Sequence, residues 1–142
     1  MNDALTPPFD TKVAFLVRDD LETWQRLNVT AFLASGITAA NPQLVGEPYL
    51  DADGGRYLPL LGIPMLVFEG TSENLVAARE RALRRDLPVA VYTRDMFRTG
   101  HDSANRAVVR AVPGADLDLV GLAAHGPKNA VDKILKGARL HP

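Results

Sequence analysis

The chain has 142 residues, with 16 lysines and arginines against 17 aspartates and glutamates, and no cysteine. A chain without cysteine forms no disulfide, carries no thiolate nucleophile and holds no iron–sulfur cluster or zinc ion through sulfur. No stretch approaches the roughly 18 apolar residues of a membrane span, and the N-terminus has no basic patch followed by an apolar run. We therefore expect a soluble, cytoplasmic protein with one α/β domain over residues 1–142, of which residues 1–11 form a flexible extension.

Four short apolar runs predict the strands of a central sheet. Each run has almost no polar residue, which is typical of strands that are covered on both faces. The four runs are Lys12–Val17, Ile63–Phe68, Val89–Tyr92 and Leu117–Ala123.

The first predicted helix follows the first strand and ends at Gly36. Asp19 is in position to cap it, and Glu22, three residues later, completes a capping box. Residues at three- and four-residue spacing predict an inner face toward the sheet that includes one polar amide. The members of this face are Trp24, Leu27, Asn28, Ala31 and Ser35.

Two further helices are predicted after the second and fourth strands. Thr71 or Ser72 caps the former, and Gly126-Pro127 begins the latter, because proline fits the first helical turn. Their predicted buried stripes are Leu75, Val76, Ala82 and Leu83 in the former and Ala130, Val131, Ile134 and Leu135 in the latter. Strands interleaved with helices predict a three-layer α/β/α fold with a four-stranded, mostly parallel or mixed sheet.

The segment Thr38–Gly62 is irregular, and Asp53-Gly54 within it favours a tight hairpin turn. Asp51-Ala52-Asp53-Gly54 also resembles the start of a calcium loop, but the sixth position is Arg56 instead of glycine and the twelfth is Gly62 instead of glutamate. The three histidines share no spacing typical of metal ligands. We predict no metal site and no cofactor.

The densest group of charged and polar residues follows the third predicted strand, in the segment Tyr92–Asp102. Ligands of open α/β sheets bind at the carboxy ends of the strands. If the first and third strands are parallel neighbours, Arg18 and the two aspartates after it reach the same edge as Arg94 and Asp95. These charges either pair and fix the loop, which we favour, or form an anion site with Asp95 as a base and the arginines as clamps. Asn28, on the first helix, either bonds the backbone or orients a ligand.

Three short motifs resemble the type 2 peptidyl-tRNA hydrolases of archaea and eukaryotes. They are Arg18-Asp19-Asp20-Leu21 after the apolar strand, Asp95-x-x-Arg98-Thr99, and Val131-Asp132-Lys133-Ile134. The chain is similar, more closely, to a bacterial family described only as a domain of unknown function and sharing this hydrolase-like fold. That similarity lies in Trp24-Gln25-x-Leu27-Asn28, Asp51-Ala52-Asp53-Gly54, Met96-Phe97-x-Thr99-Gly100 and Val131-Asp132-Lys133. The resemblance implies a peptidyl-tRNA hydrolase type 2-like fold with Asp95, Arg98 and Thr99 at positions of catalytic residues.

The chain departs from these hydrolases in three places. Thr23-Trp24-Gln25-Arg26-Leu27 stands where they carry a lysine-rich start of the first helix, with a lysine thought to be catalytic. Met96-Phe97 replaces their Ala-Gly, and Pro113–Asp116 lacks their threonine. The departures argue against esterase activity on tRNA.

We expect a protein that binds a small anionic or polar ligand at the carboxy ends of the strands, with a small molecule favoured over tRNA as the partner. The residues expected in its site are Asp95, Arg98, Thr99, Asn28, Arg18, His101 and Asp102. One alternative is a peptidyl-tRNA hydrolase-like esterase in which Asp95 activates water and Arg98 holds the oxyanion. Another is a structural or partner-binding protein, and a homodimer is expected.

Overall fold

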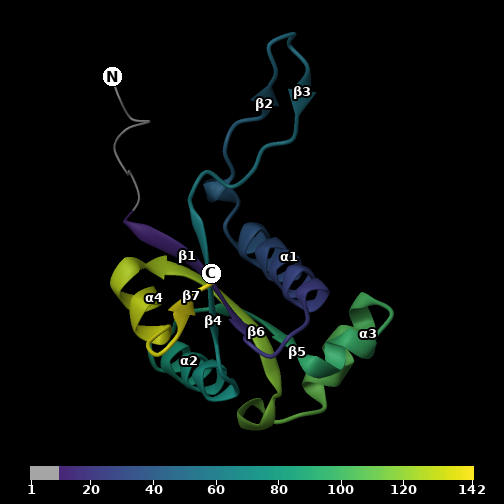
Figure 1. Ribbon diagram of the computed structural model, residues 1–142, viewed down its shortest axis with the longest axis vertical. Coiled ribbons are helices and arrows are strands. Elements are labelled where there is room, and N and C mark those ends of the chain that lie inside the picture. Colours follow the sequence, from purple (N-terminus) through teal and green to yellow (C-terminus); the bar gives the residue numbers. More distant parts are fainter. Residues whose placement is uncertain (1–9) are drawn as a thin grey trace.

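Five strands form one mixed sheet, in the order β5-β6-β1-β4-β7, in the computed structural model, which describes residues 10–142 (Figure 1). They are β1 (Thr11–Arg18), β4 (Met65–Gly70), β5 (Val89–Thr93), β6 (Leu119–Pro127) and β7 (Arg139–Leu140). β1 and β4 run parallel, and the other three neighbouring pairs are antiparallel. Residues 1–9 of the predicted N-terminal extension lie outside the described residues, and Thr11 already belongs to β1.

All four predicted runs contribute strands to this sheet, and the sheet is mixed, which is one of the two predicted alternatives, with antiparallel pairs in the majority. It differs from the prediction in having a fifth strand, β7, which is too short at two residues to leave a sequence pattern. β6 separates β1 from β5, so the first and third predicted strands are not neighbours. They still point the same way, because each is antiparallel to β6. The predicted helix start at Gly126-Pro127 is wrong, because β6 continues to Pro127.

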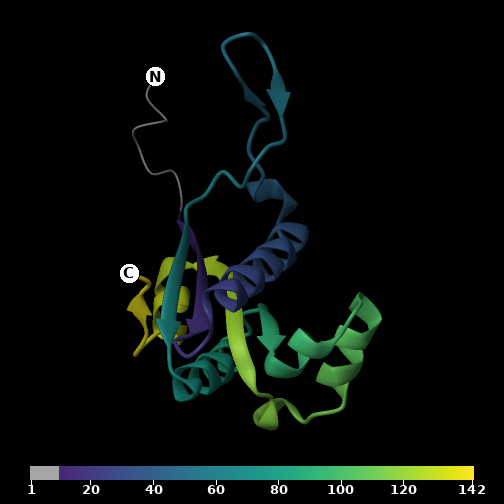
Figure 2. The same ribbon diagram turned by 45° about the vertical axis from the view of Figure 1, so that its right-hand side comes forward.

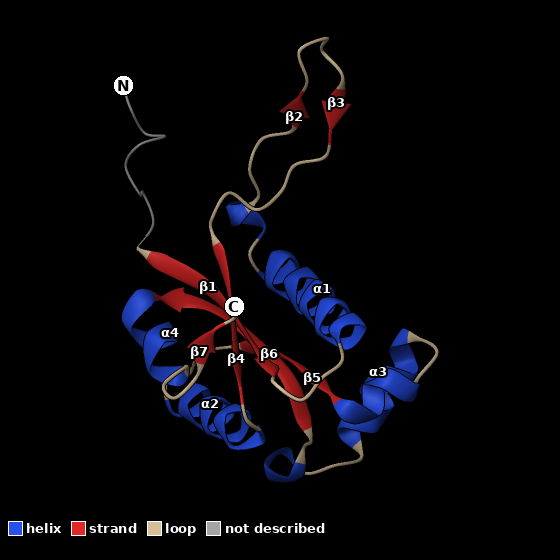
Figure 3. Ribbon diagram, in the orientation of Figure 1, coloured by secondary structure: helices blue, strands red, loops and turns tan. Residues whose placement is uncertain are grey.

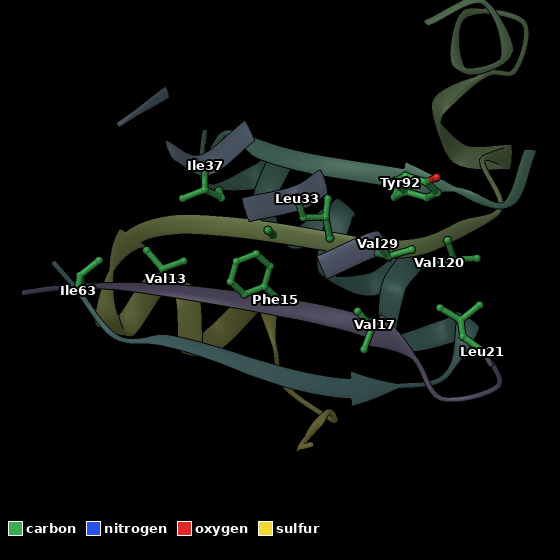
Figure 4. Close-up of a cluster of buried hydrophobic side chains, with 11 residues drawn as sticks. Val13, Phe15, Val17, Leu21, Val29, Leu33, Ile37, Ile63, Tyr92 and Val120 are labelled. Carbon is green, nitrogen blue, oxygen red and sulfur yellow. The ribbon is translucent and has the colours of Figure 1, made fainter. Parts of the chain in front are cut away.

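Helices cover both faces of the sheet (Figure 3). α1 (Thr23–Ala40) packs on one face, and α2 (Ser72–Arg84) and α4 (Lys128–Ile134) pack on the other. The alternation of side chains along β1 produces this arrangement. Val13, Phe15 and Val17 join the core under α1 (Figure 4), whereas Ala14 and Leu16 join the core under α2 and α4. No helix within residues 10–142 is long and apolar enough to cross a membrane.

The face of α1 that packs on the sheet is not the predicted one. Val29, Leu33 and Ile37 are buried, whereas Trp24 and Leu27 of the predicted inner face are 55% and 68% exposed. The prediction failed because α1 carries apolar residues all round, so that their spacing does not single out one face. Its N-terminal cap is also different from the predicted one.

The ends of α1 differ from the prediction as well. Glu22, not Asp19, caps the helix, and the side chain of Gln25 bonds back to the Glu22 backbone. The helix continues past Gly36 to Ala40. A Cβ at Gly36 would stand 3.4 Å from the Cβ of Ala90, so this glycine lets the helix pass close to β5.

α2 and α4 keep their predicted places, and only the buried stripe of α2 departs clearly from the prediction. Leu75, Ala78 and Ala82 form the buried stripe of α2, while the predicted Val76 and Leu83 are 36% and 61% exposed. Thr71 caps α2, with its hydroxyl accepting a hydrogen bond from the backbone N–H of Asn74 at 3.2 Å. α4 begins at Lys128 and buries Val131 and Ile134, as predicted.

A two-stranded hairpin within the irregular segment projects from the body of the molecule (Figure 1). Its strands are β2 (Tyr49–Leu50) and β3 (Arg56–Tyr57), and we call residues 45–61 the arm. The predicted turn is confirmed: Gly54 has a φ of +83°, and the Asp51 carboxylate accepts hydrogen bonds from the backbone N–H groups of Asp53 and Gly55 at 2.9 and 2.8 Å. The Tyr57 hydroxyl donates to the same carboxylate at 2.7 Å. The hydrogen bonds of Asp51 therefore stabilise the hairpin turn.

The remaining elements lie at the ends of the sheet. They are the 3-10 turns η2 (Pro42–Leu44), η3 (Arg94–Arg98) and η4 (Gly114–Asp116), and the helix α3 (Asp102–Arg110). α3 stands to one side of the sheet, beyond the edge strand β5 (Figure 2). α3 was not predicted, and none of its residues is buried.

The close packing of α1 on the sheet depends on a glycine in β6. A Cβ added to Gly121 would stand 2.4 Å from Cγ1 of Val29 and 3.0 Å from Cδ1 of Leu33, both of them buried core side chains. Even one methyl group therefore requires these core side chains, or α1 as a whole, to shift away from β6.

We predict that Gly121→Ala lowers the free energy of unfolding by about 1–3 kcal/mol, the usual cost of an added methylene in a packed core. Chemical denaturation followed by circular dichroism measures this change. Gly100→Ala is the matched control, because a Cβ there meets no atom within 4 Å. Equal effects of the two substitutions would show that the α1–β6 contact is not tight.

Candidate functional site

A large cleft is lined by residues of α1, the edge strand β5 and the η3–α3 segment. Its volume is about 1220 Å³. Three consecutive residues of β5, Ala90, Val91 and Tyr92, line it. Because successive side chains of a strand point to opposite faces, this lining means that the cleft meets β5 along its free edge. Backbone N–H and C=O groups of that edge are therefore within the cleft wall.

Four aromatic side chains form a continuous row along the cleft. Trp24 meets Phe97 edge to face with ring centroids 5.6 Å apart, Phe97 meets Tyr92 at 5.1 Å, and Tyr92 meets Phe32 at 5.9 Å. These spacings are those of favourable aromatic pairs. The row joins residues of α1, β5 and η3, so it holds the three walls of the cleft together.

The polar pair Asn28–Tyr92 lies within this row. The Tyr92 hydroxyl donates a hydrogen bond to Oδ1 of Asn28 at 3.3 Å. Burial raises the pKa of Tyr92 above its usual value, so the hydroxyl stays neutral and able to donate. Asn28 lines the cleft, and its side-chain carbonyl bonds a side chain instead of the backbone. Its position is therefore compatible with the interpretation in which Asn28 orients a ligand.

Three of the predicted site residues, Thr99, His101 and Asp102, make local contacts where η3 leads into α3. Nδ1 of His101 accepts hydrogen bonds from the backbone N–H of Ala104 at 3.3 Å and from the Ser103 hydroxyl at 2.9 Å, so His101 caps α3. The Thr99 hydroxyl contacts the carbonyl of Met96 and the amide of Asn105.

Asp102, the third of these residues, pairs with Arg106 at 2.6 Å. His101, Asp102 and Thr99 all line the cleft in addition to building its wall.

Arg18 lies in a ring of four charges away from the cleft lining. Its guanidinium bonds both oxygens of Asp20, at 3.2 and 2.8 Å, and Oδ1 of Asp118 at 3.0 Å. Arg94 closes the ring, with contacts of 3.2 Å to Asp118 and 3.7 Å to Asp20. This ring connects the carboxy ends of β1 and β5 to the start of β6, which is the predicted pairing that fixes the loop.

Asp95 and Arg98 form a separate pair. Their closest charged atoms are 3.9 Å apart, and their side chains are 53% and 78% exposed. Neither residue lines the cleft. The structure therefore brings together Asn28, Thr99, His101 and Asp102 as cleft residues, with Arg18 in one charged cluster and the Asp95–Arg98 pair in another.

Arg26 occupies a further ion cluster, in the region where the resembling hydrolases carry lysine. Its guanidinium donates to the carbonyls of Leu21 and Asp19 at 3.1 and 2.8 Å and approaches Glu69 at 3.4 Å. Glu69 is only 5% exposed and also pairs with Arg139. The positive charge of Arg26 therefore compensates the buried carboxylate of Glu69.

Sequence reasoning missed several residues of the cleft. Trp24 was assigned to the wrong side of α1, and the aromatic row had no regular spacing, because its members come from three elements. The four-residue spacing of Asp102, Arg106 and Arg110 was a usable signal for a short helix. Within residues 10–142, no group of three or more His, Cys, Asp or Glu side chains is placed to hold a metal ion.

The fold and the cleft define an α/β protein with a mixed five-stranded sheet covered on both faces and an aromatic cleft beside its edge strand. Over residues 11–142 the chain matches the family described as Protein of unknown function (DUF2000), and it belongs to that family. The predicted similarity to a family of unknown function is therefore confirmed at that level.

One solved structure similar to this chain is that of a protein of unknown function from Agrobacterium tumefaciens strain C58. The two sequences are 46% identical, the match covers 94% of this chain and 99% of the other, and the TM-score is 0.92. A search of curated proteins finds no match. Neither matching description names a hydrolase.

The charge ring predicts a specific dependence of stability on pH. The hydrogen bond from Arg18 is the largest cause holding the pKa of Asp20 below its ordinary value of 3.8. A depressed folded-state pKa contributes stability above the ordinary value, and that contribution is lost as the pH falls through the folded-state pKa. We predict that Asp20→Asn destabilises the protein by about 0.5–1 kcal/mol at neutral pH, because the carboxylate is half exposed.

The difference between wild type and Asp20→Asn should disappear as the pH falls below 3.8. Urea denaturation curves across the pH range measure it. Asp53→Asn is the control, since Asp53 makes no ion pair with a described residue. A difference that persists at low pH would assign the effect to packing instead of charge.

Proposed function

We propose that the cleft binds a small molecule with a flat apolar body and an anionic group. The observation that carries this proposal is the row of four aromatic rings along the cleft. Trp24 and Phe32 are more than half exposed, at 55% and 52%, so their rings are open to a ligand. Aromatic side chains at the wall of a cleft favour ring-containing ligands, which pack on their faces and edges.

The α3 side of the cleft supports an anionic group on the ligand. Arg106 and Arg110 both line the cleft. Arg106 already pairs with Asp102, whereas Arg110 makes no ion pair with any residue of the described part of the chain. A guanidinium binds a carboxylate, sulfonate or phosphate through directed hydrogen bonds. The Tyr92–Asn28 pair and the backbone of the β5 edge supply further polar groups that fix the ligand's orientation.

We also propose that the chain has the type 2 peptidyl-tRNA hydrolase-like fold that its sequence motifs imply. A mixed sheet with helices on both faces is compatible with it. Peptidyl-tRNA hydrolase activity has weaker support, because proteins that share a fold often differ in function. Asp95 and Arg98 are exposed and lie outside the cleft lining, and Arg26 is engaged by Glu69.

The binding proposal predicts that an aromatic anion binds beside Trp24, the one tryptophan of the chain. The probe is 8-anilinonaphthalene-1-sulfonate, and its counterpart without charge is N-phenyl-1-naphthylamine. We expect saturable energy transfer from Trp24 to both dyes, with tighter binding of the sulfonate. Arg110→Gln should weaken binding of the sulfonate about three- to tenfold, the effect of one partly exposed charge contact.

Two comparisons control this experiment. Arg110→Gln should leave the uncharged dye unaffected, and Arg84→Gln, on the exposed surface of α2, should leave both dyes unaffected. Absence of saturable transfer from Trp24 to either dye would refute the binding proposal. Equal weakening by the two arginine variants would refute the role of Arg110.

The hydrolase alternative predicts cleavage of peptidyl-tRNA that depends on Asp95. We expect no such cleavage, because a positioned general base contributes about 10²- to 10⁴-fold and Asp95 lies on an open surface. The measurement is release of free peptide and tRNA from peptidyl-tRNA by purified protein, with Asp95→Asn as the comparison. Robust cleavage that Asp95→Asn abolishes would replace ligand binding by catalysis as the function.

A further inference from the structure

The outer face of α1 is apolar but uncovered within residues 10–142. Trp24, Leu27 and Phe32 are 55%, 68% and 52% exposed, although the opposite face of the same helix is fully buried. The centre of the outer face carries the small residues Ala31 and Ser35, both exposed. A helix that is apolar all round is normally buried all round. The sequence of α1 is therefore suited to contacts on two sides, of which the sheet supplies one.

The arm is a second apolar surface that no residue of the range 10–142 covers. Most of its large apolar side chains are more than half exposed, with Leu58 at 84%. The others of this kind are Tyr49, Leu50, Tyr57 and Leu60. The two strands of the arm pair with each other and with no other strand of the described part of the chain. An isolated two-stranded hairpin is at best marginally stable in water, so packing of its apolar side chains on another surface would stabilise it.

We propose that a second copy of this chain covers both surfaces in a twofold-symmetric dimer. The outer faces of the two α1 helices pack antiparallel around Ala31 and Ser35, where small side chains allow close approach. Each arm then lies against the N-terminal end of the partner's α1 and against the partner's α3. The partner's arm also closes the open side of the cleft.

The position of the arm relative to α1 favours a second copy as the occupant. The arm follows the C-terminal end of α1 through η2, whereas Trp24 and α3 lie toward its N-terminal end (Figure 1). A twofold axis perpendicular to α1, placed between the two copies and beside the middle of the outer face, brings the C-terminal end of one helix beside the N-terminal end of the other. The same operation that covers one α1 with the other therefore brings each arm to the partner's cleft.

The charges of the two surfaces are complementary. The arm carries three carboxylates, Glu47, Asp51 and Asp53, against the single cation Arg56. The hydrogen bond from Tyr57 holds the pKa of Asp51 below its usual value, so this carboxylate stays ionised. The η3–α3 segment, residues 94–110, carries four arginines against two aspartates. Opposite charges on contacting surfaces favour this docking over alternatives that bring like charges together.

The size of the cleft agrees with this arrangement. Its volume of about 1220 Å³ exceeds the roughly 300–1000 Å³ of ordinary small-molecule sites. An arm that closes its open side would reduce it to that range. The dimer itself does not rest on the proposed ligand, because its contacts are those of α1 and the arm.

The test measures the mass of the whole chain by light scattering across a concentration series. We expect twice the 15.4 kDa of one chain. Leu27→Glu, at the α1 contact, and Leu58→Glu, on the arm, should each weaken dimerisation at least about 30-fold, the effect of losing a central contact. Both residues are exposed in one copy, so the variants should fold. Leu83→Glu, at an equally exposed leucine of α2, should leave the mass unchanged.

Cross-linking locates the arm, since the chain contains no cysteine of its own. A bismaleimide reagent should link Leu58→Cys chains to Arg106→Cys chains in a mixture, and not to Glu80→Cys chains, whose cysteine lies on α2. A monomer at all concentrations, or a dimer insensitive to Leu27→Glu, would overturn the proposal. Equal linking to Arg106→Cys and Glu80→Cys would overturn the placement of the arm. The ligand proposal is tested by saturable dye binding beside Trp24, whereas the dimer is tested by mass and cross-linking, so either proposal can fail without the other.

Discussion

The burial of β1 on both faces is the constraint that organises this protein. Its residues from Val13 to Val17 are at most 2% exposed, and consecutive side chains enter opposite cores. A strand of this kind requires neighbours on both edges and a layer on both faces, because otherwise its apolar side chains or its backbone groups would meet water. β4 and β6 meet the first requirement, and α1, α2 and α4 meet the second. The cleft lies outside this core, beside α1, β5 and the η3–α3 segment.

The strands were predictable because their signal is local. A run of apolar residues marks a buried strand whatever its partners are, and the turn at Gly54 is determined by the residues beside it. Strand direction is not local, and the sequence therefore left parallel and mixed sheets open. β6 inserts between β1 and β5 although it comes last of the three in the chain. Only contacts between distant segments specify that order.

The candidate site was predictable in part. The segment after β5 does contain cleft residues, among them Thr99, His101 and Asp102, and the charges of Arg18 and Arg94 do meet at one sheet edge. Charge density in the sequence, however, does not distinguish a binding surface from a set of ion pairs. Arg18 and Arg94 bind the carboxylates of Asp20 and Asp118, and their ring fastens three strand ends instead of facing the cleft.

The aromatic row escaped prediction for a different reason. Its four rings come from α1, β5 and η3, so no spacing in the sequence relates them. The assignment of α1 was the decisive error, because it placed Trp24 on the sheet side and thereby hid the wall of the cleft. A helix with apolar residues on all sides carries two overlapping patterns, and a single sequence does not reveal which of them faces the sheet.

The edge of the sheet explains why a cleft forms at this position. An edge strand exposes unpaired backbone groups that can pair with other chains, and proteins shorten or cover such edges. β7 shortens one edge to two residues that include a charged arginine. β5, at the other edge, is longer and apolar, and the η3–α3 segment stands beside it without packing closely enough to bury any residue of α3. The space between the η3–α3 segment and the free edge of β5 is part of the cleft. The same arrangement that hinders edge-to-edge pairing thus leaves a concave surface with aromatic rings, two arginines and free backbone groups, which are the groups that the proposed ligand would contact.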